Sequence, residues 1–286
     1  FSVDRETGAL RFLNRQPSHG GSPCYVTVDA TGKFVLAANY VGGNVSVFPV
    51  LEDGRLGEAT DVKQYEGSGP NRERQEAPHA HCILLDPTNR YAYVCDLGTD
   101  RVMLYRFDAA RGVLVPNEPA FVSLRPGAGP RQITFHPRRP FAYVINELDW
   151  TVTAFAQDPS HGTLKEIQTL PAHTGGSPAT DTSADIHVTP DGRFVYASTR
   201  GPDILSAFSV NGRTGQLTFI GRESAGGKSP RNFAIDPTGA FLLAANQKSD
   251  SIVTFRIDHR TGRLENTGHV AEVPSPVCLK VLDAFS

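Results

Sequence analysis

Residues 183–200 read SADIHVTPDGRFVYASTR, and this stretch contains the unit that decides the fold. It begins with the short run SADIHV at 183–188, passes through a turn centred on Thr189, and resumes with the run FVYAST at 194–199, which is rich in β-branched and aromatic residues. Residues of these types favour pleated strands, whereas Pro, Asp and Gly favour tight turns. The stretch therefore predicts two strands joined by a turn.

The same unit occurs five times along the chain. Its entry strands open at Pro23, Ala80, Pro130, Ser183 and Pro230. The turns that follow are centred on Asp29, Asp86, His136, Thr189 and Asp236. The second strands begin at Phe34, Tyr91, Phe141, Phe194 and Phe241. A third strand comes next, and then a hairpin turn of the TGxL kind at 53–56, 111–114, 161–164, 214–217 and 261–264. Four short strands about every 50 residues are typical of the blades of a β-propeller.

The sequence thus predicts an all-β fold, a β-propeller of four-stranded antiparallel blades that forms one domain over residues 1–286. Five blades are complete, and the two ends supply partial ones. Residues 1–13 contain a third strand, a turn and an outer strand, whereas residues 276–282 contain an entry strand alone. We expect either that the two ends complete one blade and close a ring of six, or that a segment upstream of Phe1 is missing.

Composition excludes several classes of protein. The chain has 286 residues, a net charge of −2 and 39% hydrophobic residues, so it is neither disordered nor collagen-like. The near-neutral charge argues against nucleic-acid and membrane-surface partners. Its four cysteines are scattered without a CxxC pair, which predicts no disulfide framework and favours a reducing, cytoplasmic location. Phe1 stands where an initiator Met would be, so a missing signal peptide carries little weight.

Superposing the five units reveals positions that vary in chemistry. Five residues before each turn residue, at the start of the entry strand, stands Cys24, His81, Arg131, Ala184 or Arg231. The position just after each second strand holds Tyr40, Leu97, Glu147, Arg200 or Gln247. Because the second strand runs antiparallel to the first, both sets belong to the same rim. Diverse residues at equivalent positions predict one asymmetric site for a small molecule; the alternative is that rim positions are merely exposed and free to vary.

Two long polar loops, residues 60–79 and 168–183, lead into this rim. Such loops are often lids or mobile linkers, although they can be uninvolved surface excursions. Lys248 could hold a substrate or be a solvated loop lysine. The candidates for substrate binding are His79, Asp185, His187, Arg231, Asn232, Gln247 and Lys248.

Other readings of the histidines and of Trp150 are weaker. His79 and His81 form an HxH pair to which His187 could add a third nitrogen for zinc, but no carboxylate accompanies them, and we expect neither a metal nor a cofactor. His136 stands where other repeats have Asp, so we interpret it as a turn residue. Trp150 could line the pocket or pack between blades.

Several of these segments resemble a known family. GAGPRQITFHP (127–137), YVINEL (143–148), SADIHVTPDGRFVYAS (183–198), SPRNFAIDPTG (229–239) and AANQKS (244–249) resemble the bacterial propeller-type 6-phosphogluconolactonases, whose wider family includes the fungal carboxymuconate cyclase. The resemblance extends from about residue 20 to 282. It implies a seven-bladed propeller, so that about one blade would precede Phe1. It also implies an active-site set of His81, Arg131, Glu147 and Arg200, all members of the rim found by superposition.

The expected reaction is hydrolysis of a small anionic sugar lactone, most readily 6-phosphogluconolactone. Glu147 or His81 would be the general base, and the other would assist proton transfer to the ring oxygen. Arg131 and Arg200 would stabilise the oxyanion or grip an anionic group. Arg231 and Lys248 could hold a phosphate. Glu147→Gln and Arg131→Ala are each expected to abolish turnover while the fold survives.

Two alternatives stay open. The same residues could catalyse a cyclase reaction, in which the arginines bind the substrate carboxylates and His81 or Glu147 donates a proton. This alternative stays open because arginine recognises phosphate and carboxylate alike. A non-catalytic binding propeller would need a more apolar mouth. In either case the expected partner is a small molecule, with no nucleic acid and no membrane, and the protein is a monomer or a weak homo-oligomer.

Overall fold

The structure is a computed structural model that describes residues 1–174 and 181–281. All of its regular elements are β-strands. In the described part of the chain, no helix could cross a membrane. The chain divides into two compact units. The first consists of Phe1–Gly129 and Pro159–Thr163, and the second consists of Pro130–Asp158 and Leu164–Val281.

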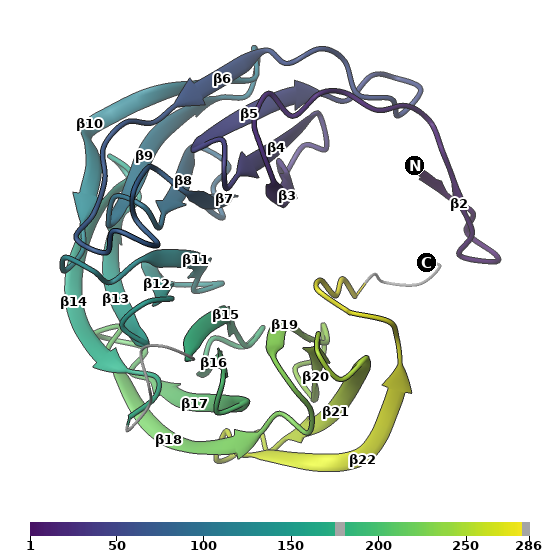
Figure 1. The fold of residues 1–286 in the computed structure, drawn as a ribbon, viewed down its shortest axis with the longest axis vertical. Helices are drawn as coiled ribbons and strands as arrows, with labels where there is room; N and C mark the ends of the chain where they lie inside the picture. The colour runs from purple at the N-terminus through teal and green to yellow at the C-terminus, as the bar shows by residue number, and fades with distance from the viewer. Residues whose placement is uncertain (175–180, 282–286) are drawn as a thin grey trace. The chain divides into compact units, whose positions relative to one another are not determined.

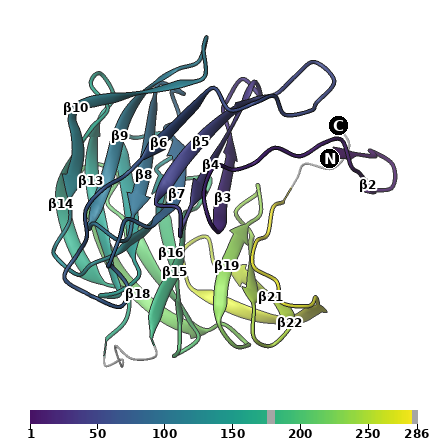
Figure 2. The same cartoon turned by 45° about the horizontal axis from the view of Figure 1, so that its top comes forward.

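The first unit contains two four-stranded antiparallel sheets and one hairpin (Figure 1). The first sheet is formed by β3 (Pro23–Val28), β4 (Phe34–Asn39), β5 (Asn44–Pro49) and β6 (Asp61–Gln64). The second sheet is formed by β7 (Ala80–Leu85), β8 (Tyr91–Asp96), β9 (Arg101–Asp108) and β10 (Val113–Ser123). The hairpin pairs β1 (Ser2–Val3) with β2 (Leu10–Arg11). The entry strands β3 and β7 lie beside each other (Figure 2).

The second unit contains three more sheets of the same kind. The first consists of β11 (Pro130–Phe135), β12 (Phe141–Asn146), β13 (Thr151–Asp158) and β14 (Thr163–Pro171). The next consists of β15 (Thr182–Val188), β16 (Phe194–Arg200), β17 (Ile204–Val210) and β18 (Leu217–Ser224). The last consists of β19 (Pro230–Ile235), β20 (Phe241–Asn246), β21 (Ser251–Ile257) and β22 (Leu264–Glu272). The entry strands β11, β15 and β19 are neighbours in that order.

The five complete units of the sequence are confirmed as five four-stranded sheets, with three corrections at the margins. Residues 276–281 form no strand, because the Leu279 N–H donates to the Asn232 side chain instead of a strand ladder. The loop predicted at 60–79 contains β6. The loop predicted at 168–183 is shortened by β14 and β15, and its residues 175–180 lie outside the described residues.

One side chain closes the turn between the first two strands of each sheet. In the first sheet the Asp29 carboxylate accepts hydrogen bonds from the Lys33 and Phe34 N–H groups, both at 2.8 Å. His136 does the same work with a different atom, because its Nδ1 accepts from the Arg138 and Arg139 N–H groups, both at 3.1 Å. The interpretation of His136 as a turn residue is therefore confirmed.

The TGxL hairpins explain how neighbouring sheets pack. Gly262 adopts φ +72°, and a Cβ on it would lie 2.4 Å from Cδ1 of Phe194 in the neighbouring sheet. Its carbonyl accepts a hydrogen bond from the buried Tyr196 hydroxyl at 2.8 Å. Gly215 meets Phe141 and the Tyr143 hydroxyl in the same way. The glycine in this turn thus serves both the backbone conformation and a close approach between sheets.

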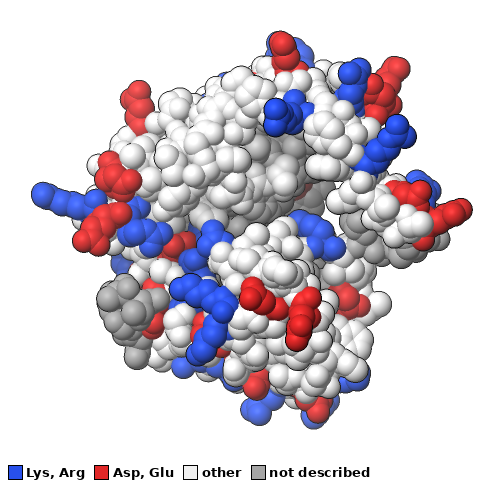
Figure 3. Space-filling view, turned by 45° about the vertical axis from the view of Figure 1, so that its right-hand side comes forward, with Lys and Arg blue, Asp and Glu red and all other residues white. Residues whose placement is uncertain are grey.

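Charged side chains of both signs are interspersed on the face drawn in Figure 3. This agrees with the small net charge of −2. A basic face wide enough to bind a nucleic acid is not seen there.

Candidate functional site

The rim positions found by superposition coincide with β-bulges. Each entry strand shifts register against its second strand near its first residue, so that the ladder skips one residue. The residues that the register skips are Cys24, His81, Arg131 and Arg231. In β15 the shift spans two residues, Ala184 and Asp185. Bulges re-aim a side chain away from the regular ladder and are common beside active sites.

Three charged side chains meet in the second unit. Arg131 Nε lies 2.7 Å from Glu147 Oε2, and the two side chains are only 3% and 5% exposed. Arg200 Nη2 lies 3.2 Å from the same oxygen, with its side chain 15% exposed. Glu147 follows the end of β12, whereas Arg200 is the last residue of β16. The cluster therefore joins two sheets through one carboxylate oxygen.

The backbone of β15 holds the two arginines in place. The Ala184 carbonyl accepts a hydrogen bond from Arg131 Nη1. The Ser183 carbonyl accepts one from Arg200 Nη2 at 3.1 Å, and the Ser183 N–H donates to the Glu147 carbonyl at 3.1 Å. The bulge leaves the Ala184 carbonyl outside the ladder and available to a side chain.

The cluster carries excess positive charge. Burial and the charges of Arg131 and Arg231 together lower the pKa of Arg200 to about 10, against the opposing effect of Glu147. Arg200 is still a cation at neutral pH. Arg131 and Arg200 share one carboxylate, and the charge of Arg231 also acts on Arg200, so the cluster keeps excess positive charge that attracts an anionic ligand.

A second group is built around Asp185, the additional bulge residue. Its Oδ2 lies 3.0 Å from His187 Nε2 and accepts hydrogen bonds from the Asn232 side-chain amide at 2.5 Å and the Phe233 N–H at 3.1 Å. The Asn232 Oδ1 in turn accepts from the Leu279 N–H at 2.6 Å. Asp185, His187 and Asn232, all predicted as substrate-binding, are therefore in one hydrogen-bonded group.

In the first unit, the two predicted histidines surround Tyr40. The His79 ring stacks on the Tyr40 ring with centroids 4.4 Å apart, and the His81 ring meets it edge-on at 5.6 Å. His79 Nδ1 lies 3.0 Å from the Tyr40 carbonyl, and its Nε2 lies 3.1 Å from Glu76 Oε1. Both ring nitrogens of His79 are thus engaged by protein oxygens.

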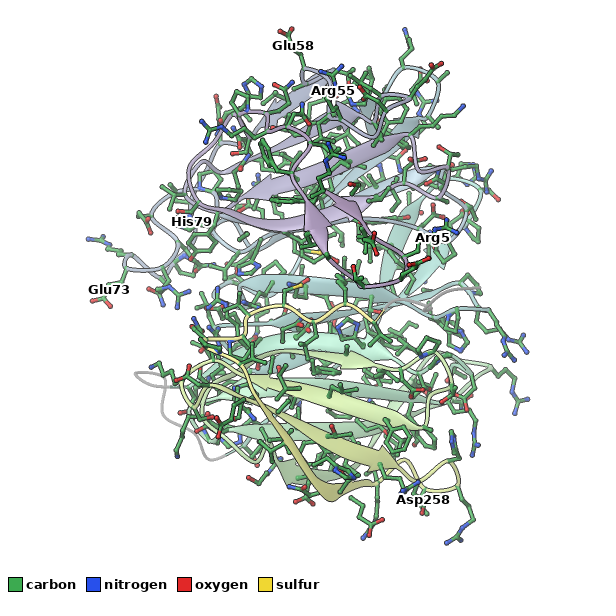
Figure 4. All side chains as sticks on the ribbon, turned by 90° about the vertical axis from the view of Figure 1, so that its right-hand side faces the viewer. Arg5, Arg55, Glu58, Glu73, His79 and Asp258 are labelled. Carbon is green, nitrogen blue, oxygen red and sulfur yellow. The ribbon has the colours of Figure 1, made fainter. Side chains whose placement is uncertain are left out.

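The loop before His79 is anchored by residues that the sequence analysis did not single out. Buried Gln75 donates to the Leu97 carbonyl at 2.9 Å and to Asp100 Oδ1 at 2.8 Å. The Asp96 carboxylate accepts the His79 N–H at 2.7 Å. Figure 4 shows Glu73 projecting from this loop and His79 nearer the sheet. No residue-type pattern marks Gln75, because a lone glutamine in a polar loop is ordinary.

The remaining predicted residues are more loosely placed. Arg231 and Gln247 are half-buried, and Lys248 is exposed. Trp150 donates from Nε1 to the Asp181 carbonyl at 2.9 Å and lies against His173, which favours packing. Among the described residues, no group of three His, Cys, Asp or Glu side chains is arranged to hold a metal ion.

Comparison with known proteins agrees with this architecture. A family model described as "Lactonase, 7-bladed beta-propeller" matches residues 1–281. The chain belongs to this lactonase family. The predicted β-propeller class and the resemblance that accompanied it are thereby confirmed.

Several proteins similar to this chain are named lactonases. A Bacillus subtilis protein named 6-phosphogluconolactonase is 43% identical over 282 residues, which cover 99% of this chain and 79% of that protein. A crystal structure from Bacteroides fragilis, provisionally designated a 6-phosphogluconolactonase, superposes with a TM-score of 0.93 at 40% identity, over 99% of this chain and 79% of that one. The periplasmic gluconolactonase of Pseudomonas aeruginosa gives a TM-score of 0.91 at 33% identity, with the same coverage.

Proposed function

We propose that this lactonase hydrolyses 6-phosphogluconolactone to 6-phosphogluconate. The observation that carries the proposal is the pairing of Arg131 and Arg200 with the single carboxylate of Glu147, together with the charge of Arg231 that acts on Arg200. A site with excess guanidinium charge suits a phosphorylated substrate and an oxyanion. The relatives named 6-phosphogluconolactonase support the choice of lactone.

Burial suggests how the roles divide within the cluster. Arg200 and Arg231 are the more exposed arginines and would meet the substrate, whereas Arg131 and Glu147 are almost wholly enclosed. Glu147 Oε2 already faces two guanidinium groups, which stabilise its charged form and weaken it as a base. We therefore assign Glu147 and Arg131 to positioning Arg200. His81 stays a candidate for proton transfer beside any other base in the site, and the substrate-binding parts of His79, Asn232, Gln247 and Lys248 remain proposals.

A pH-stat assay tests the function directly, because each hydrolysed lactone yields a carboxylic acid that releases a proton. The purified protein is expected to accelerate acid release from 6-phosphogluconolactone far above the spontaneous rate. Carboxymuconolactone serves as the comparison substrate for the cyclase alternative. Turnover of that lactone alone would refute the proposal.

Gluconolactone without a phosphate is a second candidate substrate, because the P. aeruginosa neighbour is named a gluconolactonase. The two differ in the anionic group that the arginines would hold. If the arginine cluster binds phosphate, kcat/KM is higher for the phosphorylated lactone, and inorganic phosphate inhibits competitively. Equal kcat/KM values would favour the unphosphorylated substrate.

We also propose a cytoplasmic location. Cys82 and Cys95 are opposite each other in β7 and β8, wholly buried, and both are free thiols. A reducing compartment preserves such a pair. Cell fractionation of the native source tests this, and sedimentation of the purified protein tests the expected monomer or weak homo-oligomer.

A further inference from the structure

His187 is the most exposed titratable side chain in the two charged groups of the second unit. Its side chain is 36% exposed, compared with 15% for Arg200, 5% for Glu147 and 4% for Asp185. Its ring meets Phe233 edge-on with centroids 4.9 Å apart, which fixes the plane of the imidazole. A ring that is oriented on one side and open on the other is suited to contact a ligand.

Asp185 is held rigidly as the partner of that ring. Oδ1 accepts the Ile186 N–H at 3.0 Å, while Oδ2 receives His187, Asn232 and Phe233. Its own N–H leaves the ladder and donates to Ser198 Oγ at 3.1 Å. Burial would raise the pKa of Asp185, but the charge and hydrogen bond of His187, the Phe233 N–H and the Arg131 charge lower it below its ordinary value. Asp185 is therefore a carboxylate at neutral pH.

The carboxylate fixes the tautomer of the ring. A carboxylate can only accept, so Nε2 of His187 carries the proton and donates it to Asp185 Oδ2. Nδ1 of the neutral ring then has a free lone pair. Within residues 1–174 and 181–281, Nδ1 of His187 has no hydrogen-bond partner. The charged or titratable groups on the packed elements are Arg131 of β11, Tyr143 of β12, Tyr196 and Arg200 of β16, and Arg231 of β19.

We propose that His187, oriented by Asp185, is the general base that activates water in this site. The proposal rests on the proposed lactone hydrolysis. Nδ1 of His187 takes a proton from water as the water oxygen bonds to the lactone carbonyl carbon. The resulting oxyanion collapses, the bond from that carbon to the ring oxygen breaks, and the imidazolium returns its proton to the ring oxygen. Lactone and water thereby give one hydroxy acid, and the base is restored.

The position of the dyad along β15 fits a phosphorylated lactone. The Ser183 and Ala184 carbonyls hold Arg200 and Arg131, and Asp185 is the next residue. A strand rises about 3.3 Å per residue, so His187 lies roughly 10 Å along the strand from Ala184. One end of an extended sugar phosphate would reach the arginines while its other end reaches the imidazole.

The first test needs no substrate. In ¹⁵N-histidine-labelled protein, the ring signals of His187 are assigned by their absence in His187→Gln. Neutral His187 is expected to carry its proton on Nε2, and Asp185→Asn is expected to give a mixture of tautomers. A proton on Nδ1 in the wild-type protein would overturn the proposal.

The second test is chemical rescue. His187→Ala is expected to lower kcat for 6-phosphogluconolactone by about 10²–10⁴-fold, and added imidazole is expected to restore part of it. Asp185→Asn is expected to lose about 10- to 100-fold without rescue. The matched control is His136→Asp, which installs the residue that other turns use and is expected to keep kcat and to ignore imidazole.

The outcomes separate the two proposals. If the wild-type protein is silent on 6-phosphogluconolactone but cleaves another lactone, the substrate assignment fails and the rescue is measured on that lactone. Unchanged kcat in His187→Ala, or loss without rescue in a variant whose thermal unfolding is normal, overturns the role of His187. Where His187→Ala does not fold, His187→Gln replaces it for kcat, and the tautomer measurement on the wild-type protein still decides.

Discussion

Arg131 and Glu147 form an ion pair of 2.7 Å between two side chains that are almost completely buried. Removing two charges from water is costly, and such a pair is stable only when further hydrogen bonds complete it. Here the Ala184 carbonyl and Arg200 supply them. The buried pair thus holds the more exposed Arg200 side chain in position.

Glu147→Gln should therefore damage both activity and stability. It leaves Arg131 and Arg200 facing each other without their shared counter-charge. We expect kcat/KM to fall by at least about 10²-fold and the free energy of unfolding to fall by about 3–5 kcal/mol. Kinetics and urea unfolding measure the two effects. Adding Arg131→Ala to Glu147→Gln should cost much less than the two single changes together; strictly additive losses would contradict the coupling.

Arg200→Lys retains the positive charge but loses the planar guanidinium group and its several N–H donors. Arg200 reaches Glu147 and the Ser183 carbonyl with Nη2, and the Thr182 carbonyl with Nε at 3.4 Å. An ammonium group cannot reproduce this planar arrangement. Losing one or two charge-assisted hydrogen bonds predicts a fall in kcat/KM of about 10- to 10²-fold. Steady-state kinetics measure this fall in kcat/KM, with the exposed Arg213→Lys as the control. Equal values of kcat/KM in the two variants would argue against a role for the planar guanidinium group of Arg200.

Asp185 should make stability depend on acid. Its folded-state pKa lies below the ordinary value of 3.8, so its stabilising contribution is complete above that value and is lost as the pH falls through the folded pKa. Asp185→Asn should be less stable than the wild-type protein at pH 6, and the difference should shrink below about pH 4. Urea midpoints measured from pH 6 to pH 3 test this. A difference that stays constant over the range would show that the charge of Asp185 contributes nothing.

The fold was predictable because each repeat contains its own strand-forming and turn-forming residues at equivalent positions. Asp29 and His136 close equivalent turns with different atoms, and both were recognised from their position. The prediction for the final segment was wrong because composition alone does not determine whether a strand forms. Residues 276–281 have the composition of an entry strand, but a strand also needs ladder hydrogen bonds, and Leu279 finds a side-chain amide instead.

The site was predictable only in part. Arg131, Glu147 and Arg200 stood out because their chemistry differs from that of their counterparts in other repeats. The bulges that aim Arg131 and Asp185 depend on the register between two strands, which residue types alone do not fix. Residue types therefore point to the members of the candidate site but not to the difference in exposure between Glu147 and His187.

The hairpin glycines allow packing to be separated from backbone strain. Gly262 and Gly32 have almost the same φ, +72° and +70°, but a Cβ would meet Phe194 at 2.4 Å in the first case and nothing within 4 Å in the second. Alanine at either position costs about 1–2 kcal/mol for the left-handed backbone. Gly262→Ala should lose a further 1–3 kcal/mol or so from overpacking. Urea unfolding of the two variants measures the difference. Equal losses in the free energy of unfolding would mean that the contact between Gly262 and Phe194 adjusts to the extra methyl group without loss of stability.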